Sequence, residues 1–261
     1  MNQQSIQLHD LAIGYPSHHG WLSVAAHLEA TAPAATLTCL IGRNGMGKST
    51  LLRTVARMQP RLGGDIDIGA KPIDSFSATA FARQLGIVLT KRTDAENITV
   101  GELVALGRAP HTGFWGRLSD DDRQIVDHAM RLVGIESMAH RRANSLSDGE
   151  HQKAMIARVL AQATPFILLD EPTAFLDFPG KIELMQLLAR LAHEQGKTIL
   201  LSTHDLETAL QTADRLWLLD RRGICQGSPE GLAADGSIGR YIDRDDVRLD
   251  PSTMSISIIK Q

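Results

Sequence analysis

The sequence has few features that would cross-link the chain or place it in a membrane. Two cysteines, Cys39 and Cys225, are too few and too far apart for a disulfide framework. Cys39 lies in an apolar run, where a cysteine is usually a buried thiol. No stretch approaches the roughly 18 apolar residues that a membrane-spanning helix needs. The N-terminal MNQQSIQLHD has no apolar core of a signal peptide. We expect a soluble, cytoplasmic protein that reaches a membrane only through a partner.

An excess of charge of one sign is also missing. The 27 lysines and arginines are nearly balanced by 30 aspartates and glutamates, and the formal net charge is -3. This balance gives no electrostatic argument for a nucleic-acid-binding protein or for a polybasic membrane anchor. The length is sufficient for a sizeable core, in one large domain or in a domain with a subdomain.

Short apolar runs alternate with helical segments along most of the chain. Such alternation indicates a mostly parallel sheet covered on both faces. A turn at Gly14 is expected to end the first strand, and Ser77 is expected to cap a helix. The pattern predicts strands at residues 6–13, 24–29, 36–42, 85–90, 166–170, 198–203 and 214–220, and helices at residues 48–58, 77–84, 179–194 and 206–212.

A mostly helical stretch at about residues 97–161 interrupts this alternation. It contains the helical patterns TVGELVALGR and SDDDRQIVDHAMRLVGI, with the loop APHTGFWGRL between them, and a helix after Gly149. We predict one domain over residues 1–230 with this helical subdomain inserted. The weakly patterned residues 231–261 are predicted to form a tail that packs on the domain or extends it.

The segment GRNGMGKS, residues 42–49, fits the phosphate-binding pattern G-x-x-x-x-G-K-[S/T]. Glycines let the backbone N–H groups approach a phosphate closely, and the N-terminus of the following helix adds to the cradle. Lys48 is predicted to reach the β- and γ-phosphates, and the Ser49 hydroxyl to bind Mg²⁺. An ordinary glycine-rich turn is the alternative, but the segment follows a predicted strand and opens a predicted helix.

Two further strands end in polar residues that suit the same chemistry. FILLDEP ends in Asp170, which is predicted to hold Mg²⁺, and Glu171, which is predicted to polarise the attacking water. LSTHD places His204 at the end of another strand, on the edge where open α/β sheets bind ligands. Taken alone, such acids are more often helix caps or solvated turns, and a lone histidine is usually structural. The phosphate-binding pattern upstream favours the functional interpretation.

Five segments in order, GRNGMGKST, LSDGE, ILLDEP, AFLD and STHD, resemble the Walker A, signature, Walker B, D-loop and H-loop motifs of ABC-type ATPases. The resemblance covers about residues 6–229. It implies an α/β P-loop NTPase fold of the ABC type, with a mostly parallel core sheet, an antiparallel N-terminal β portion and a helical subdomain. It also implies ATP hydrolysis with Mg²⁺ by two chains that pair head to tail around two ATP molecules.

The resemblance assigns roles to individual residues. Ser147 and the Gly149 backbone are expected to contact the γ-phosphate held by the partner subunit's Lys48, and Asp177 to lie at the dimer seam. Tyr15 matches the aromatic residue that stacks on adenine, although a surface aromatic at a turn is the alternative. Glu171 and His204 are the expected catalytic residues. The expected metal ligands are Ser49, Thr90 and Asp170, and the expected ATP-binding residues are Tyr15, Gly42, Asn44, Gly45, Gly47, Lys48, Ser49, Thr50, Ser147 and Gly149.

Two positions depart from the family's pattern. The signature is commonly LSGGQ, and this chain has Asp148 and Glu150 at its third and fifth positions. Ser147 and Gly149 are retained, so we expect activity to survive. The strand LGIVLT is expected to end in the glutamine of the Q-loop, but Thr90 stands there. Gln84 comes before this strand, too early to be the same position.

The stretch NITVGELVALGRAPHTGFWGRLSDDD resembles import ATPases for iron–siderophore complexes, haem and cobalamin. By this resemblance, Arg108, Pro110 and His111 lie on the surface that receives a membrane-spanning permease; an exposed loop without a partner is the alternative. The implied assembly is a homodimer of ATPase subunits bound to permease subunits at the cytoplasmic face of the inner membrane. A periplasmic or surface substrate-binding protein would act indirectly, and no nucleic acid takes part.

Other ABC-type functions fit less well. Soluble ABC ATPases of DNA repair or translation carry long coiled coils or two fused cassettes, and this chain has one cassette and no heptad run. A regulatory module without hydrolysis would lack a catalytic residue, but Glu171 and His204 are both present. Exporters usually fuse the membrane span to the cassette, and this sequence contains no such span. Siderophore, haem and cobalamin stay open as cargo, because a cytoplasmic ATPase does not contact it.

Overall fold

The computed structural model describes residues 4–17, 20–89, 97–113, 116–242, 247–250 and 253–258. Within this part of the chain the core sheet has the strand order β10-β9-β3-β8-β7-β6. Strands β9 to β6 are parallel, and β10 pairs antiparallel with β9 at one edge, which confirms the predicted mostly parallel sheet. The strands are β3 (Leu37–Gly42), β6 (Leu85–Val88), β7 (Phe166–Asp170), β8 (Thr198–Thr203), β9 (Arg215–Asp220) and β10 (Gly223–Gly227).

A second, antiparallel sheet has the order β2-β1-β4-β5 in the described residues. It consists of β1 (Ile6–Ser17), β2 (Gly20–Ala32), β4 (Gly63–Ile68) and β5 (Lys71–Pro72). The predicted turn at Gly14 is wrong, because β1 continues to Ser17 and pairs with β2. A Cβ atom on Gly14 would lie 2.2 Å from the Leu22 carbonyl oxygen. This glycine therefore allows two strands to approach closely instead of ending one.

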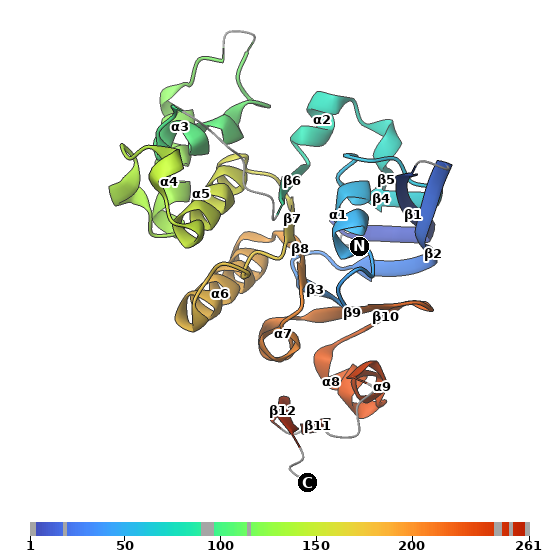
Figure 1. Ribbon diagram of the computed structural model, residues 1–261. Helices are drawn as coiled ribbons and strands as arrows, with labels where there is room; N and C mark the ends of the chain where they lie inside the picture. The colour runs from blue at the N-terminus through green and yellow to red at the C-terminus, as the bar shows by residue number, and fades with distance from the viewer. Residues whose placement is uncertain are drawn as a thin grey trace.

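Helices between β6 and β7 form a group beside the core sheet. Figure 1 shows α3, α4 and α5 at the upper left, and the antiparallel strands lie at the right, with the core strands between the two. Thr99, Ser119 and Ser147 cap the three helices, each in a capping box with an acidic residue three positions later. The group consists of α3 (Val100–Ala105), η2 (Leu106–Arg108), α4 (Asp120–Leu132), η3 (Glu136–Met138), η4 (Ala143–Ser145) and α5 (Asp148–Ala161).

The remaining elements cover the core or follow it. Ser77 caps a short helix as predicted, and its side chain accepts a hydrogen bond from the Ala80 amide. After β10, two short helices lead to a hairpin whose Leu249, Met254 and Ile256 pack against the core. These elements are α1 (Lys48–Val55), η1 (Ile73–Ser75), α2 (Ala78–Ala82), α6 (Phe178–Gln195), α7 (Leu206–Thr212), α8 (Pro229–Ala234), α9 (Ser237–Ile242), β11 (Val247–Asp250) and β12 (Ser255–Ile258).

The core sheet is buried on both faces. Along β7, Ile167 and Leu169 belong to the apolar cluster shared with α3–α7, whereas Phe166 and Leu168 belong to the cluster shared with the antiparallel sheet and α1. This alternation follows from the period of two along a strand. Cys39 is fully buried, and its burial raises the pKa of its thiol. Because both faces are covered, the ends of the strands are the places where polar groups can meet a ligand.

Candidate nucleotide site at the ends of β3, β7 and β8

Three neighbouring parallel strands bring the predicted residues to one edge of the sheet. In the sheet, β8 lies between β3 and β7. Ile41 of β3 is in register with Thr203, and Asp170 of β7 is in register with Ser202. The phosphate-binding segment follows β3, the acid pair ends β7, and His204 follows β8. Side chains that are far apart in the sequence therefore meet at one carboxyl-terminal edge.

The phosphate-binding segment forms a tight loop into α1. Gly45 and Gly47 have φ angles of 82° and 97°, in the region that glycine adopts at no steric cost. A Cβ atom on Gly47 would lie 2.5 Å from Val24 of β2, so this loop packs directly on the antiparallel sheet. Lys48 is buried, and its Nζ donates a hydrogen bond of 2.8 Å to the Gly42 carbonyl. The two left-handed glycines therefore give the loop a tight turn directly before α1.

A hydroxyl and a carboxylate lie together at the start of α1. Ser49 Oγ donates to Asp170 Oδ1 at 3.0 Å, and Ser202 Oγ donates to the same oxygen at 2.7 Å. Ser202 Oγ also accepts a hydrogen bond of 3.0 Å from the Glu171 amide. Sequence reasoning missed Ser202, although its place two residues before His204 on a strand beside β7 is a usable signal. This buried serine holds both acids in place.

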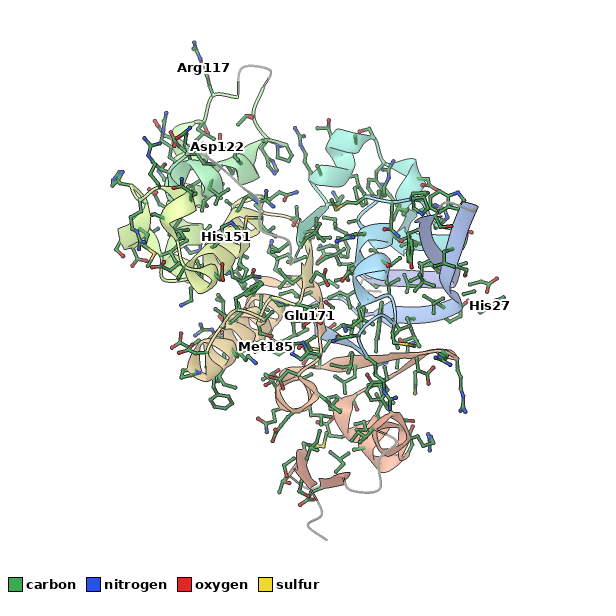
Figure 2. The ribbon with its side chains drawn as sticks, viewed as in Figure 1. His27, Arg117, Asp122, His151, Glu171 and Met185 are labelled. Carbon is green, nitrogen blue, oxygen red and sulfur yellow. The ribbon has the colours of Figure 1, made fainter. Side chains whose placement is uncertain are left out.

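Glu171 lies between a cation and a histidine. Its Oε1 is 3.4 Å from Lys48 Nζ, and its Oε2 is 2.5 Å from His204 Nδ1. The side chain of Glu171 is 16% exposed and that of His204 is 58% exposed, so water can reach this pair. The Glu171 backbone has a φ of 50°, which is uncommon for a residue other than glycine. Figure 2 shows Glu171 near the middle of the molecule.

The predicted signature residues lie at the start of α5, beside the segment that precedes α6. Ser147 caps α5, and a Cβ atom on Gly149 would lie 3.4 Å from both the Phe175 carbonyl oxygen and Leu176 Cδ2. Asp177 caps α6 by accepting a hydrogen bond of 3.1 Å from the Gly180 amide. Signature and D-loop residues line one shared hollow of this chain. These contacts join the signature to the D-loop of its own chain.

The structure describes most of the remaining predicted site residues, beginning with Tyr15 on β1. Tyr15 is 45% exposed on β1, two residues after Ile13, whose side chain lies beside Gly47. Its strand therefore passes next to the phosphate-binding loop. Thr90, the predicted substitute for the Q-loop glutamine and a predicted metal ligand, lies outside the described residues. Asn44 and Thr50 lie in the loop and in the first turn of α1, respectively.

The expectation that Arg108 belongs to an exposed partner surface is wrong for its side chain, which is 8% exposed. Its Nε donates to Asp122 Oδ1 at 2.8 Å, and its Nη1 donates to the Ala161 carbonyl at 2.9 Å. A guanidinium offers five donors in a fixed fork, which suits it to join several elements. His111 is exposed, with Nε2 2.9 Å from the Gln162 carbonyl oxygen.

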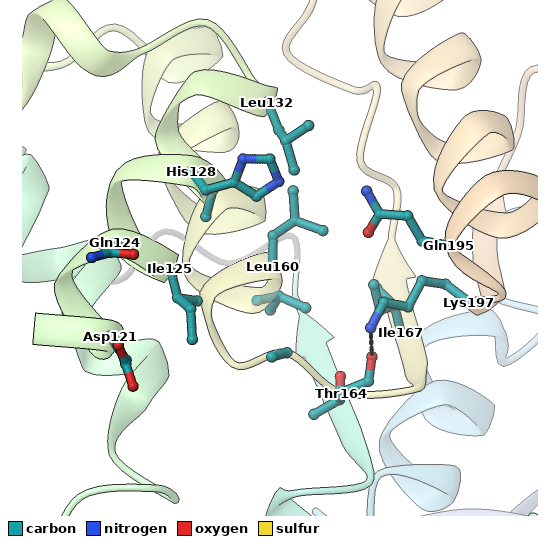
Figure 3. A pocket seen from close by; sticks show the side chains of 13 residues that line it. Asp121, Gln124, Ile125, His128, Leu132, Leu160, Thr164, Ile167, Gln195 and Lys197 are labelled. Carbon is teal, nitrogen blue, oxygen red and sulfur yellow. Dashed lines mark hydrogen bonds between the residues drawn. The ribbon is translucent and has the colours of Figure 1, made fainter. Parts of the chain in front are cut away.

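A pocket of about 440 Å³ lies between α4, the end of α5 and the start of β7 (Figure 3). Apolar side chains such as Leu132, Leu160 and Ile167 line it together with His128. Lys197 Nζ donates to the Thr164 carbonyl at 2.8 Å, and burial lowers the pKa of this lysine. Thr164 precedes β7, whereas Asp170 ends it. The pocket therefore lies at the opposite end of the strand from the acid pair and is separate from the nucleotide site.

The fold and the loop between β3 and α1 are those of a P-loop ATPase. Comparison with known proteins gives the family: residues 26–174 match the family described as ABC transporter. The chain belongs to the ABC transporter family of ATP-binding proteins, and the predicted ABC-type ATPase fold is confirmed. In the described residues, no helix combines the length and the hydropathy that crossing a membrane requires.

Relatives in the same family are named as import or transport ATP-binding proteins. The chain is 43% identical over 199 residues to the petrobactin import ATP-binding protein FpuC of Bacillus anthracis, covering 76% of this chain and 73% of that protein. It is 38% identical over 232 residues to the ferric enterobactin transport ATP-binding protein FepC of Escherichia coli K12, covering 88% and 84%. The solved structure of cbiO1 from Clostridium perfringens, part of the transporter complex cbiONQ, has a TM-score of 0.74 at 27% identity, covering 91% and 94%.

Proposed function

We propose that this chain is the ATP-hydrolysing subunit that powers a membrane-spanning permease, which imports either an iron complex (a siderophore or haem) or cobalamin. The observation that carries the proposal is a cluster of contacts at one sheet edge. Ser49 contacts Asp170, and Glu171 contacts both Lys48 and His204. Ser202 joins the two groups. The names of FpuC and FepC support an iron–siderophore complex among these cargoes. The subunit would act at the cytoplasmic face of the membrane, bound to its permease.

ATP fits the loop and the residues around it. Lys48 is the cation for the β- and γ-phosphates, and it is already held at the loop by the Gly42 carbonyl. The first N–H groups of α1 are free of intrahelical partners by the geometry of every helix start, and they point toward the loop. Tyr15, on the strand that passes this loop, is the stacking partner for adenine. The other proposed contacts with ATP come from residues of the loop and the first turn of α1, namely Asn44, Gly45, Gly47, Ser49 and Thr50.

The oxygen donors at the start of α1 also suit Mg²⁺. Ser49 Oγ and Asp170 Oδ1 lie 3.0 Å apart, and Mg²⁺ prefers hard oxygen ligands and keeps several waters. When bound, Mg²⁺ neutralises charge on the transferred phosphate. Ser49 would hold the ion directly and Asp170 would hold it through its water shell, with Thr90 as a further proposed ligand. Ser202 keeps Asp170 oriented toward this position.

Glu171 and His204 are suited to the hydrolytic step. A carboxylate at the strand end accepts a hydrogen bond from water and polarises it for attack on the γ-phosphate. His204 lies within hydrogen-bond distance of that carboxylate and is exposed enough to reach the phosphate as well. Lys48, at 3.4 Å from Glu171, is the residue that positions the phosphate beside the carboxylate. The 3.4 Å contact between this carboxylate and the lysine supports the two proposed roles.

The signature needs a second copy of the chain. In its own chain Gly149 packs against Phe175 and Leu176, and Ser147 opens α5, whose N-terminal dipole favours an anion. We assign Ser147 and Gly149 to the γ-phosphate held by the partner subunit's Lys48 in a head-to-tail dimer. In this arrangement two chains complete two sites, so that ATP binding and dimer formation are one event. The permease would convert the closure of the dimer into transport.

Glu171→Gln tests this proposal. The amide keeps the shape of the side chain and loses the negative charge that polarises water, so hydrolysis should fall by two orders of magnitude or more, to about 1% of the parental rate. ATP should then convert the variant into a stable dimer, measured by gel filtration, while ADP should not. Glu183→Gln, an exposed position on α6, is the matched control and should hydrolyse ATP at the parental rate. Parental hydrolysis in Glu171→Gln would remove Glu171 from the mechanism.

The cargo class needs a separate measurement. The permease encoded beside this subunit, reconstituted with it in lipid vesicles, should stimulate ATP hydrolysis when a ferric siderophore is supplied on its binding protein. If cobalamin or haem stimulated hydrolysis and a ferric siderophore did not, the cargo would be that compound instead of a siderophore complex. Failure of any permease to stimulate hydrolysis would refute the transport role.

A further inference from the structure

The signature of this chain carries two acidic residues, Asp148 and Glu150, in the first turn of α5. Glu150 is engaged on both of its oxygens. Its Oε2 accepts hydrogen bonds from the Ser147 amide at 2.8 Å and from Ser147 Oγ at 3.0 Å. Its Oε1 accepts a hydrogen bond of 2.9 Å from Arg141 Nη1. The second arm of the same guanidinium, Nη2, donates to the Ser145 carbonyl at 3.1 Å.

These contacts pose an electrostatic problem for the proposed dimer. The Ser147 hydroxyl has one hydrogen, and the structure directs it at a carboxylate. The hydrogen bonds from the Ser147 amide and hydroxyl hold the pKa of Glu150 below its usual range, so this carboxylate is charged at neutral pH. A γ-phosphate contacting Ser147 would thus approach a fixed negative charge. Repulsion between like charges at this separation opposes closure of the dimer.

Arg141 is the cation that offsets this charge. Its side chain is 44% exposed and that of Glu150 is 26% exposed, so their pair adds little to the stability of the fold. Lys153 also lines the hollow at the signature, but the direct contact with the carboxylate is that of Arg141. The backbone of Arg141 is tied in separately, because its carbonyl accepts a hydrogen bond of 2.9 Å from the Val100 amide. Truncating the side chain should therefore leave the local fold intact.

We propose that Arg141 is a positioning residue of the ATP-bound dimer. It neutralises Glu150 and draws that carboxylate toward itself, so that the Ser147 hydroxyl can turn to the γ-phosphate held by the partner subunit. The inference rests on the proposed head-to-tail function and adds a residue to it. Arg141 and Glu150 act as one unit. The chain tolerates an acid at the fifth position of the signature because Arg141 neutralises its charge.

The test measures ATP-driven dimerisation in the Glu171→Gln background by analytical ultracentrifugation. Arg141→Met removes the charge and keeps much of the apolar stem. The dissociation constant of the ATP-bound dimer should rise roughly tenfold, because a dimer contains two signatures and each contributes a few-fold through a partly exposed charge pair. Nucleotide affinity of the monomer should stay unchanged. Arg123→Met, which breaks an exposed pair with Asp120, is the matched control and should dimerise like its parent.

A second substitution separates charge from shape. Arg141→Met combined with Glu150→Gln should restore dimerisation to within about twofold of the parent, and the defect of Arg141→Met alone should shrink in 0.5 M salt because screening weakens the repulsion. A double variant as weak as Arg141→Met, or an Arg141→Met protein that dimerises like its parent, would overturn this inference alone. Absence of any ATP-driven dimer in the Glu171→Gln parent would overturn the proposed function with it.

Discussion

At the scale of single residues, Ser202 shows how one hydroxyl can organise two carboxylates. It is fully buried, donates to Asp170 Oδ1 at 2.7 Å and accepts from the Glu171 amide at 3.0 Å. Ser202 contacts the side chain of Asp170 and the backbone of Glu171, so the two acids cannot reorient independently of each other. The residue is a positioning group for the site as well as part of the sheet.

We predict that Ser202→Ala lowers the free energy of unfolding by about 1–2 kcal/mol, because it removes one donor and one acceptor from buried partners. Urea denaturation measures this change. Ser75→Ala, which removes a local hydrogen bond between the exposed Ser75 and the Pro72 carbonyl, is the control and should change stability by less than about 0.5 kcal/mol. Equal stability of both variants would show that the Ser202 hydroxyl carries no structural role.

At the scale of elements, Arg108 and Asp122 join η2, the start of α4 and the end of α5. Figure 2 shows Asp122 in the helical group at the upper left of the molecule. Asp122 accepts hydrogen bonds from both the amide and the hydroxyl of Ser119 as well as from Arg108. The Ser119 side chain, the Ser119 amide and Arg108, in that order of size, lower the pKa of Asp122 to about 2 from its ordinary 3.8.

This pKa gives a pH dependence with a definite sign. A lowered folded-state pKa means that ionised Asp122 stabilises the fold fully above its ordinary pKa, and that the stabilisation is lost as the pH falls from about 4 through about 2. We predict that Asp122→Asn flattens the pH dependence of unfolding in this window. Thermal unfolding followed by circular dichroism measures it. Asp127→Asn, exposed on the same helix, is the control and should keep the parental slope.

The elements also show which structural features could be predicted from the sequence and which could not. Caps and strand ends depend on local chemistry, so Ser77, the glycines of the phosphate loop and the acid pair were predictable from neighbouring residues. Gly14 and Arg108 were not, because their roles depend on distant partners. Gly14 lies against Leu22 across a strand pair, and the Arg108 side chain is covered by Asp122 and α5. A residue's type and spacing do not specify which distant element will cover it.

At the scale of the whole molecule, the start of α6 exposes aromatic surface next to the D-loop. Phe178 is 74% exposed and follows Asp177, and Phe175 is 48% exposed three residues earlier. A large apolar side chain left in water beside a predicted dimer seam is suited to burial by a second copy of the chain.

We predict that Phe178→Ser weakens ATP-driven dimerisation of the Glu171→Gln protein at least fivefold and changes monomer stability by less than about 0.5 kcal/mol. Sedimentation velocity and urea denaturation measure the two quantities on one preparation. Met58→Ser, at a side chain that is 57% exposed outside the D-loop, is the control and should dimerise normally. Unaltered dimerisation of Phe178→Ser would place this aromatic outside the seam.

The contact between Lys48 Nζ and Glu171 Oε1 has a consequence for the order of events in a catalytic cycle. Each group is the other's counter-ion, so the acid that should activate water is restrained by the cation that should bind phosphate. A phosphate that took Lys48 as its partner would free Glu171 Oε1 in the same movement, while His204 would still contact Oε2. In the proposed site, nucleotide binding itself would therefore free one oxygen of the carboxylate, with no separate movement of the chain.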